Sequence, residues 1–162
     1  MPTILGIEST CDETGASVVE DGRRVLSNVV ATQIDLHAKY RGVVPEIASR
    51  AHIENILPVL RESLHQANLT LADITAISVA HRPGLIGSLL IGVTAAKTLA
   101  WSMNKPLIGV DHVHAHLYSV MLADDSPIIS AVAIAAVIAV VAARYPAGRR
   151  RCVRTASLGA AK

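Results

Sequence analysis

The feature that most constrains the fold is a change in the spacing of apolar residues near position 43. Before it come three short β-rich runs separated by polar turns, at residues 3–7, 16–19 and 25–34. They predict three consecutive antiparallel strands. After it, apolar side chains recur at helical spacing across residues 43–69. Pro45 suits the first turn of this helix, whereas Pro58 lies inside the pattern and is expected to kink or break it.

The rest of the chain alternates strand and helix patterns. The predicted elements are a strand at 74–80, a helix at 85–101, a strand at 107–110 and a helix at 112–122. The complete order, β-β-β-α-β-α-β-α, predicts an α/β fold in which a mixed sheet has flanking helices. Because 51% of the residues are hydrophobic and 17% are charged, the chain does not have the composition of a disordered protein.

Charge divides the chain into two unlike parts. All 13 Asp and Glu lie in residues 1–127, together with nine of the 15 Lys and Arg. The six other basic residues lie in residues 128–162, so the formal net charge of +2 conceals an acidic part and a basic part. An apolar run at 128–143 with arginines after it is a marginal candidate for a membrane anchor, because a spanning helix needs about 20 apolar residues.

The cysteines and the N-terminus indicate the cellular compartment in which the protein is expected. Cys11 and Cys152 lie far apart and form neither a disulfide framework nor a zinc pattern. The first ten residues have no basic region and no long apolar stretch, so they do not form a signal peptide. The sequence therefore predicts a cytoplasmic protein that does not act at a membrane.

The first candidate site is the acidic segment 8–15, which contains three carboxylates and three hydroxyls between the first two predicted strands. Its backbone amides and hydroxyls, including those of Ser9 and Thr10, could hold a phosphate, and Asp12 or Glu13 could bind a cation or act as a base. An exposed polar turn is the alternative interpretation. Cys11 is interpreted as structural, because neighbouring carboxylates disfavour a thiolate.

The second candidate is the turn from strand to helix at Pro83–Leu89, which contains Gly84 and Gly87. Amides at the start of a helix favour an anion, so these glycines could contact a phosphate. Close packing is the alternative explanation for both.

The third candidate is a group of histidines at the start of the last predicted helix. His112 and His116 lie four residues apart, so they share one helical face and could hold a metal through two imidazoles. His114 points elsewhere, and no third ligand stands at a telling spacing. Satisfied structural histidines remain the alternative. The other histidines are interpreted as structural: His37, His52, His65 and His81.

Four segments occur in an order typical of one family. They are Ile4-Leu-Gly-Ile-Glu-Ser-Thr-Cys-Asp-Glu-Thr14, Gly42-Val-Val-Pro-Glu-Ile-Ala-Ser-Arg50, Pro83-Gly-Leu-Ile-Gly-Ser-Leu-Leu-Ile-Gly92 and His112-x-x-x-His116. Together they resemble the tRNA N6-adenosine threonylcarbamoyltransferase family, formerly known as the O-sialoglycoprotein endopeptidase or glycoprotease family. The resemblance implies the first lobe of an actin-like, sugar-kinase-like ATPase fold of the ribonuclease H-like type.

The resemblance also implies a reaction. It would transfer a threonylcarbamoyl group from threonylcarbamoyl-adenylate to N6 of the adenosine next to the anticodon of tRNA. The partners implied are tRNA and the other proteins of the pathway, including a paralogous inactive subunit.

The resemblance assigns roles to the candidate residues. His112 and His116 would bind one divalent metal ion, iron or zinc. Asp12 and Glu13 would lie at the acyl-adenylate site as catalytic carboxylates. The predicted substrate-binding groups are Ser9, Thr10, Gly84 and Gly87.

Three departures from the family pattern are visible. Arg82 stands where the family usually has glycine before the Pro-Gly turn, and is expected to crowd the loop or alter its phosphate contacts. The family's Ser-Gly-Gly-His-Thr block and its second lobe have no counterpart in the Ala- and Arg-rich residues 136–162. We therefore predict an N-terminal lobe over residues 1–135 and a tail encoded out of frame, with weak or no activity. Reading the encoding DNA in its other frames tests this interpretation.

Three other functions stay open. A non-catalytic half-fold could act as a partner subunit in the same tRNA-modification complex, although the intact His112/His116 pair favours descent from the catalytic branch. A glycoprotease lacks support, because the motif has no glutamate after its first histidine as zinc proteases do. A membrane-anchored fragment rests only on residues 128–143.

Overall fold

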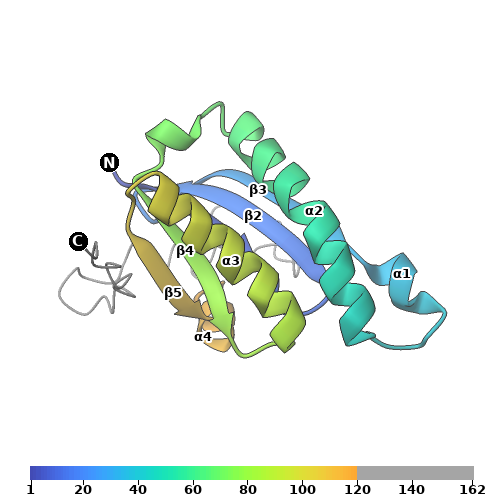
Figure 1. Cartoon of the computed structure of the whole chain (residues 1–162). Helices are drawn as coiled ribbons and strands as arrows, with labels where there is room; N and C mark the ends of the chain where they lie inside the picture. The colour runs from blue at the N-terminus through green and yellow to red at the C-terminus, as the bar shows by residue number, and fades with distance from the viewer. Residues whose placement is uncertain (120–162) are drawn as a thin grey trace, which may run out of the picture.

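A five-stranded mixed sheet with the order β3-β2-β1-β4-β5 forms the centre of the structure (Figure 1). In this computed structural model, residues 1–119 are described. β1 (Thr3–Glu8) pairs antiparallel with β2 (Glu13–Glu20), which pairs antiparallel with β3 (Arg24–Thr32). On its other side β1 pairs parallel with β4 (Ala76–Arg82), and β4 pairs parallel with β5 (Leu107–Asp111).

Two long helices lie side by side against one face of this sheet. α2 (Pro45–Gln66) packs on β2 and β3, and α3 (Ile86–Ser102) packs on β4 (Figure 1). A short helix, α1 (Ile34–Ala38), follows β3 at one end of the molecule. The fourth helix, α4 (His112–Ser119), begins directly after β5 and lies behind the sheet in this view.

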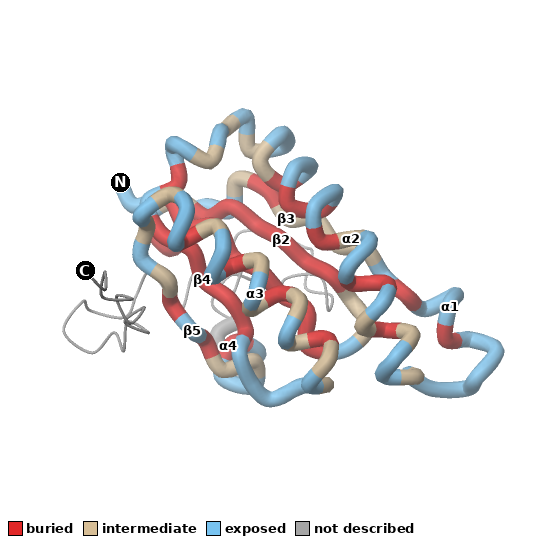
Figure 2. The backbone as a smooth tube through the Cα atoms, in the orientation of Figure 1, coloured by how far each residue is buried: buried red, intermediate tan, exposed pale blue. Residues whose placement is uncertain are grey.

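The core lies between the sheet and these two long helices. Alternate residues of the strands point into it, including Leu5, Ile7 and Val79, and they meet buried residues of α2 such as Ile56 and Leu60. Figure 2 shows the central strands buried along most of their length. On α3 the buried positions carry small residues, Gly92, Ala96 and Ala100 among them, so this helix approaches the sheet closely.

The predicted order of elements is confirmed across the described residues, apart from a short 3-10 helix at Leu71–Asp73 before β4 and differences at two other points. α2 runs without a break through Pro58, so the predicted break is wrong. Pro58 is exposed, while Ile56, Val59 and Leu60 beside it are buried, and this packing holds the helix together across the missing hydrogen bond. The second difference is α1, which was not predicted and which begins at Ile34, the last residue of the predicted strand.

Some predictions fall on residues outside the described part. They concern the apolar run 128–143, the tail 136–162 and the end of the helix predicted at 112–122. Within residues 1–119, no helix is both long and apolar enough to cross a membrane.

Candidate functional site at the carboxyl ends of the parallel strands

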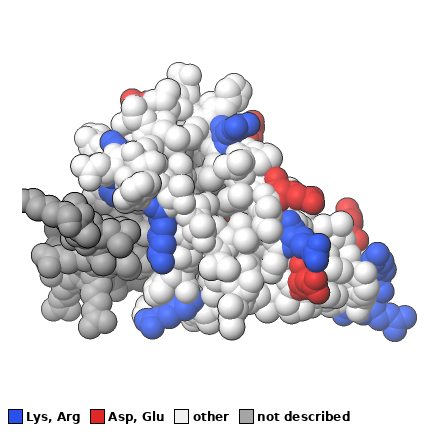
Figure 3. All heavy atoms as spheres, viewed as in Figure 1, with Lys and Arg blue, Asp and Glu red and all other residues white. Residues whose placement is uncertain are grey.

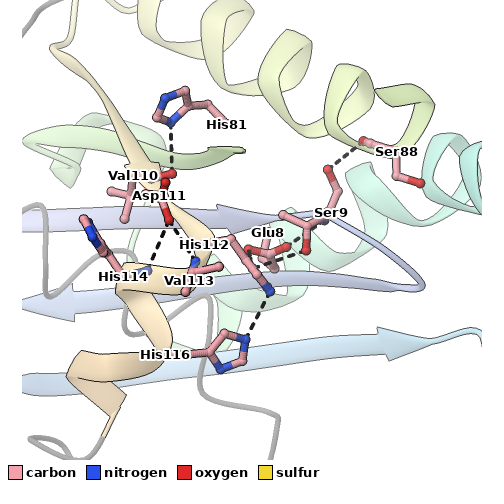
Figure 4. A network of polar contacts seen from close by, with 11 residues as sticks. Glu8, Ser9, His81, Ser88, Val110, Asp111, His112, Val113, His114 and His116 are labelled. Carbon is pink, nitrogen blue, oxygen red and sulfur yellow. Dashed lines mark hydrogen bonds and ion pairs between the residues drawn. The ribbon is translucent and has the colours of Figure 1, made fainter. Parts of the chain in front are cut away.

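The three parallel strands end beside one another, and three of the candidate segments begin there. β1 ends at Glu8, β4 at Arg82 and β5 at Asp111. Ligands of open α/β sheets bind at this edge, outside the carboxyl ends of the strands. The acidic loop at residues 9–12, the turn before α3 and the start of α4 therefore meet where a ligand site is expected (Figure 4).

The loop at residues 9–12 is tied to the first turns of α3. The buried Ser9 hydroxyl donates to the Ser88 carbonyl at 2.8 Å and accepts from the Gly92 N–H at 3.1 Å. The Leu85 N–H donates to the Thr10 carbonyl at 2.8 Å. Ser9 and Thr10 are both buried, so this segment is not the exposed polar turn considered as the alternative.

Both glycines of the turn lie in close contact with neighbouring segments. A Cβ on Gly84 would lie 2.6 Å from the Thr10 carbonyl oxygen, and one on Gly87 would overlap the Ser49 hydroxyl of α2. Close packing therefore accounts for both glycines, and their contact with a substrate stays a prediction.

His52 of α2 holds the same loop from the other side. Its Nε2 lies 3.1 Å from the Cys11 carbonyl and its Nδ1 lies 2.7 Å from the Thr14 hydroxyl. Because a carbonyl only accepts, Nε2 carries the proton and the Thr14 hydroxyl donates to Nδ1. Burial lowers the pKa of His52, which keeps this neutral form. The sequence marked His52 as structural, but no pattern placed it against the loop.

The two predicted catalytic carboxylates occupy the end of the loop and the start of β2. Asp12 is half-buried, and its carbonyl accepts a hydrogen bond of 3.1 Å from the Gln33 N–H. Glu13 opposes Thr32 in the sheet. Burial, followed by the charges of Asp12 and Glu8, raises the pKa of Glu13. A carboxyl group of raised pKa is better suited to proton transfer than an ordinary surface glutamate.

Cys11 shares this acidic surrounding. Partial burial, a hydrogen bond with Asp12 and the nearby carboxylate charges raise the pKa of its thiol to about 11. The thiolate is therefore scarce at neutral pH, which agrees with the prediction that Cys11 is not a nucleophile.

Glu8 joins the acidic loop to α4. Its side chain is buried; Oε1 accepts a hydrogen bond of 2.6 Å from the Thr10 N–H, and Oε2 lies 3.3 Å from Nδ1 of His112. The Thr10 hydroxyl lies 3.2 Å from the same nitrogen. The contact with Glu8 raises the pKa of His112. Sequence reasoning included Glu8 in the acidic segment but gave it no role of its own.

His112 and His116 converge, as their spacing predicts. Their Nε2 atoms lie 3.1 Å apart, and the rings meet edge to face with centroids 4.6 Å apart. Burial and the adjacent His112 lower the pKa of His116. Figure 4 shows His114 turned to the other side of the helix, also as predicted.

Asp111 caps the helix that carries the two histidines. Its Oδ1 accepts hydrogen bonds from the Val113 and His114 N–H groups at 3.0 and 3.2 Å. Its Oδ2 lies 3.3 Å from Nε of Arg82, the residue that departs from the family pattern. These contacts, led by the His114 N–H, lower the pKa of Asp111. The Arg82 side chain is largely exposed and lies against this cap.

The two converging imidazoles fit two positions in the coordination shell of a divalent metal ion. Among residues 1–119, no group of three His, Cys, Asp or Glu side chains is placed to hold such an ion. The described residues therefore bring together the two predicted ligands, His112 and His116, and their binding of a metal stays a prediction.

Comparison with known proteins identifies the family. A model of the TsaD family, tRNA N6-adenosine threonylcarbamoyltransferase, matches residues 24–153. The chain belongs to the TsaD family.

Curated relatives agree with this assignment. The tRNA N6-adenosine threonylcarbamoyltransferase of Symbiobacterium thermophilum is 60% identical over 124 residues, which are 76% of this chain and 36% of that protein. The corresponding protein of Treponema denticola is 61% identical over 124 residues, again 76% of this chain and 37% of the relative. This TsaD-family chain thus spans little more than a third of the length of these relatives.

Solved structures agree on the fold. YeaZ from Pseudomonas aeruginosa is 21% identical, with a TM-score of 0.56 over 73% of this chain and 48% of YeaZ. T. thermophilus RuvC, solved with a Holliday junction substrate, is 16% identical, with a TM-score of 0.54 over 86% of this chain and 91% of RuvC. These likenesses confirm the predicted α/β, ribonuclease H-like fold of the TsaD-family chain.

Proposed function

We propose that this chain carries part of the active site of a tRNA threonylcarbamoyltransferase. In this proposal His112 and His116 supply two metal ligands, and the acidic loop contributes to the acyl-adenylate site. The observation that carries it is the convergence of the two Nε2 atoms, 3.1 Å apart, in a chain of the TsaD family. The metal, iron or zinc, would supply Lewis-acid polarisation of the carbamoyl carbonyl.

The transfer forms one bond and breaks another. The N6 amine of adenosine attacks the carbamoyl carbon of threonylcarbamoyl-adenylate, and AMP leaves with the electron pair of the broken C–O bond. The amine gives up a proton, and a nearby carboxylate can accept it. We assign this step to Asp12 or Glu13, which adjoin each other where the loop meets β2.

The loop contributes mainly by its rigidity. Ser9 and Thr10 are held by α3, and the Cys11 carbonyl is held by His52 and by the Ser88 hydroxyl at 3.1 and 3.2 Å. A loop held on both sides keeps Asp12 and the adjoining Glu13 in one position, and fixed positions of reacting groups lower the barrier of a transfer reaction. We propose that Ser9, Thr10, Gly84 and Gly87 shape the substrate side of this loop.

Metal binding tests the first part of the proposal. Titration of the chain with Co²⁺ or Zn²⁺ is expected to show one site that His112→Ala and His116→Ala each weaken strongly. His114→Ala is the matched control, because it removes an imidazole from the same helix on the side away from the pair. Equal affinity in all four proteins would contradict the assignment of the two ligands.

An activity assay tests the reaction. It supplies tRNA, threonine, bicarbonate and ATP together with the partner proteins of the pathway, and it detects N6-threonylcarbamoyladenosine. The substitution Asp12→Ala or Glu13→Ala is expected to abolish turnover in a TsaD-family protein that is active in this assay. Unchanged turnover of either variant would remove that residue from the catalytic role.

We also propose a protein partner of the same fold, the paralogous inactive subunit. What supports it is a set of apolar side chains on α2 and α3, each at least 59% exposed: Ile53, Leu57, Ile86 and Leu90. Figure 3 shows few charged side chains across the middle of this face. Exposed apolar surface of this kind is typical of protein interfaces.

Light scattering with the purified partner tests the proposed interface. The substitution Leu57→Glu is expected to weaken association, whereas Gln66→Glu on the same helix adds the same charge outside the apolar set. Equal weakening by both changes would contradict this interface.

A further inference from the structure

Glu8 is a buried carboxylate that the proposed reaction does not use. Its side chain is about 6% exposed at the last position of β1. Removing a charge from water is costly unless hydrogen bonds replace the lost solvation. Both of its oxygens have partners, the Thr10 N–H at 2.6 Å and Nδ1 of His112 at 3.3 Å. The contact with Nδ1 determines which nitrogen of the His112 ring carries a proton.

An ionised carboxylate only accepts hydrogen bonds, so its contact with His112 requires a proton on Nδ1. The Thr10 hydroxyl, 3.2 Å from the same nitrogen, can accept from that proton as well. The opposite tautomer would set the Nδ1 lone pair against the Glu8 carboxylate, and the two would repel. Of the two neutral tautomers of His112, Glu8 therefore favours the one with Nδ1–H.

In that form the other ring nitrogen, Nε2, carries a lone pair. This nitrogen faces Nε2 of His116 at 3.1 Å, and in the proposed function these two nitrogens would hold the metal ion (Figure 4). Carboxylates behind metal-binding histidines orient the ring, and their loss lowers metal affinity about 10- to 100-fold.

We propose that Glu8 is a positioning residue that fixes the tautomer and the orientation of His112 for metal binding. The proposal rests on the metal-binding function assigned above, and it adds a residue from β1 to a site otherwise built from α4. Glu8 touches no substrate in this account, because it acts only through His112.

Two measurements on three proteins test the proposal. Nitrogen-15 NMR of the histidine rings in mildly alkaline, metal-free buffer is expected to show His112 as the Nδ1–H tautomer in the unsubstituted chain. In Glu8→Ala the Nε2–H tautomer is expected to become substantial. Titration with Zn²⁺ is expected to show about 10- to 100-fold weaker binding by Glu8→Ala. Glu20→Gln is the control, because it removes a carboxylate at the far end of β2.

The outcomes separate this proposal from the proposed function. If folded Glu8→Ala keeps both the tautomer and the Zn²⁺ affinity, the role of Glu8 is wrong while metal binding stands. If the unsubstituted chain binds no Zn²⁺, the metal-binding function fails, whatever the NMR spectra show. If Glu8→Ala does not fold, Glu8→Gln serves in its place. The amide of Glu8→Gln keeps the shape but has one acceptor oxygen in place of two. With that oxygen on the Thr10 N–H, its NH2 group faces Nδ1 of His112 and favours the Nε2–H tautomer. The same tautomer shift and weaker binding are therefore expected, and their absence overturns the proposal.

Discussion

The Gly92 N–H donates a hydrogen bond of 3.1 Å to the hydroxyl of Ser9, and this contact joins the middle of α3 to the end of β1. The same hydroxyl donates to the Ser88 carbonyl, so the side chain of Ser9 is satisfied on both sides. A Cβ at position 92 would overlap the Ser9 hydroxyl. The approach of helix to loop therefore requires glycine here.

The substitution Gly92→Ala is expected to lower the free energy of unfolding by about 1–3 kcal/mol, because overpacking moves α3 away from the loop. This loss would occur although alanine favours a helix over glycine by about 1 kcal/mol. Chemical denaturation measures the change. Gly42→Ala is the matched control, since no atom lies within 4 Å of its added Cβ, and its effect should be neutral or slightly stabilising. Equal effects of the two substitutions would contradict the packing argument.

His52 is expected to contribute to stability through its two ring contacts. His52→Gln should lower the free energy of unfolding by about 1–3 kcal/mol near neutral pH, because the buried Thr14 hydroxyl loses its partner and the Cys11 carbonyl keeps only the Ser88 hydroxyl. His65→Gln is the control, since His65 lies exposed on the same helix. A loss of similar size in both variants would show that the contacts of His52 with the loop do not matter.

The pH dependence of this contribution has a definite sign. The pKa of His52 is lowered from 6.5 in the folded chain, mainly by burial, so the unfolded chain takes up the proton more readily. The contribution is complete above pH 6.5 and is lost as the pH falls through the lower folded pKa. His112, whose pKa is raised, contributes in the opposite sense. The difference in unfolding free energy between the unsubstituted chain and His52→Gln should therefore shrink as the pH falls below 6.5.

The fold could be predicted from the sequence because its signals are local. The change from strand to helix spacing and the turn at Pro83-Gly84 follow from residues that are neighbours in the chain. The convergence of His112 and His116 was predictable for the same reason, since both lie on one turn and a half of one helix. At Pro58 the prediction of a break was wrong, because packing of the buried residues around it outweighs a local preference.

The contacts that build the site were beyond sequence reasoning. Glu8 meets His112 across 104 positions of the chain, and His52 meets the Cys11 carbonyl across 41. Such pairs depend on strand order and register, which a single sequence does not reveal. The spacing rules that found the histidine pair therefore could not find the carboxylate behind it.

The Cys11 thiol is expected to react slowly with iodoacetamide. Because its pKa is raised to about 11, the rate should climb about tenfold per pH unit through neutral pH and should not level off near the value of about 8.5 for a free thiol. Asp12→Asn should speed the reaction at neutral pH, since the adjacent charge is removed. The measurement uses a Cys152→Ser background so that one thiol is followed. A rate that levels off near pH 8.5 would show that the acidic loop does not control this thiol.

Asp111 is expected to stabilise the first turn of α4 by its hydrogen bonds to backbone N–H groups, and its ion pair with Arg82 is expected to contribute little. Asp111→Ala removes the acceptor of the Val113 and His114 N–H groups, so both amides should exchange faster with solvent in hydrogen-exchange NMR. Arg82→Ala removes only a largely exposed ion pair and should leave these rates nearly unchanged.

The pKa of Asp111 is lowered from 3.8, so the cap is complete above that pH and weakens as the pH falls through the lower folded pKa. Because the cap holds the turn that carries His112, Asp111→Ala should also weaken Zn²⁺ binding. Equal exchange rates of the Val113 and His114 amides in Asp111→Ala and Arg82→Ala would refute the capping role of Asp111.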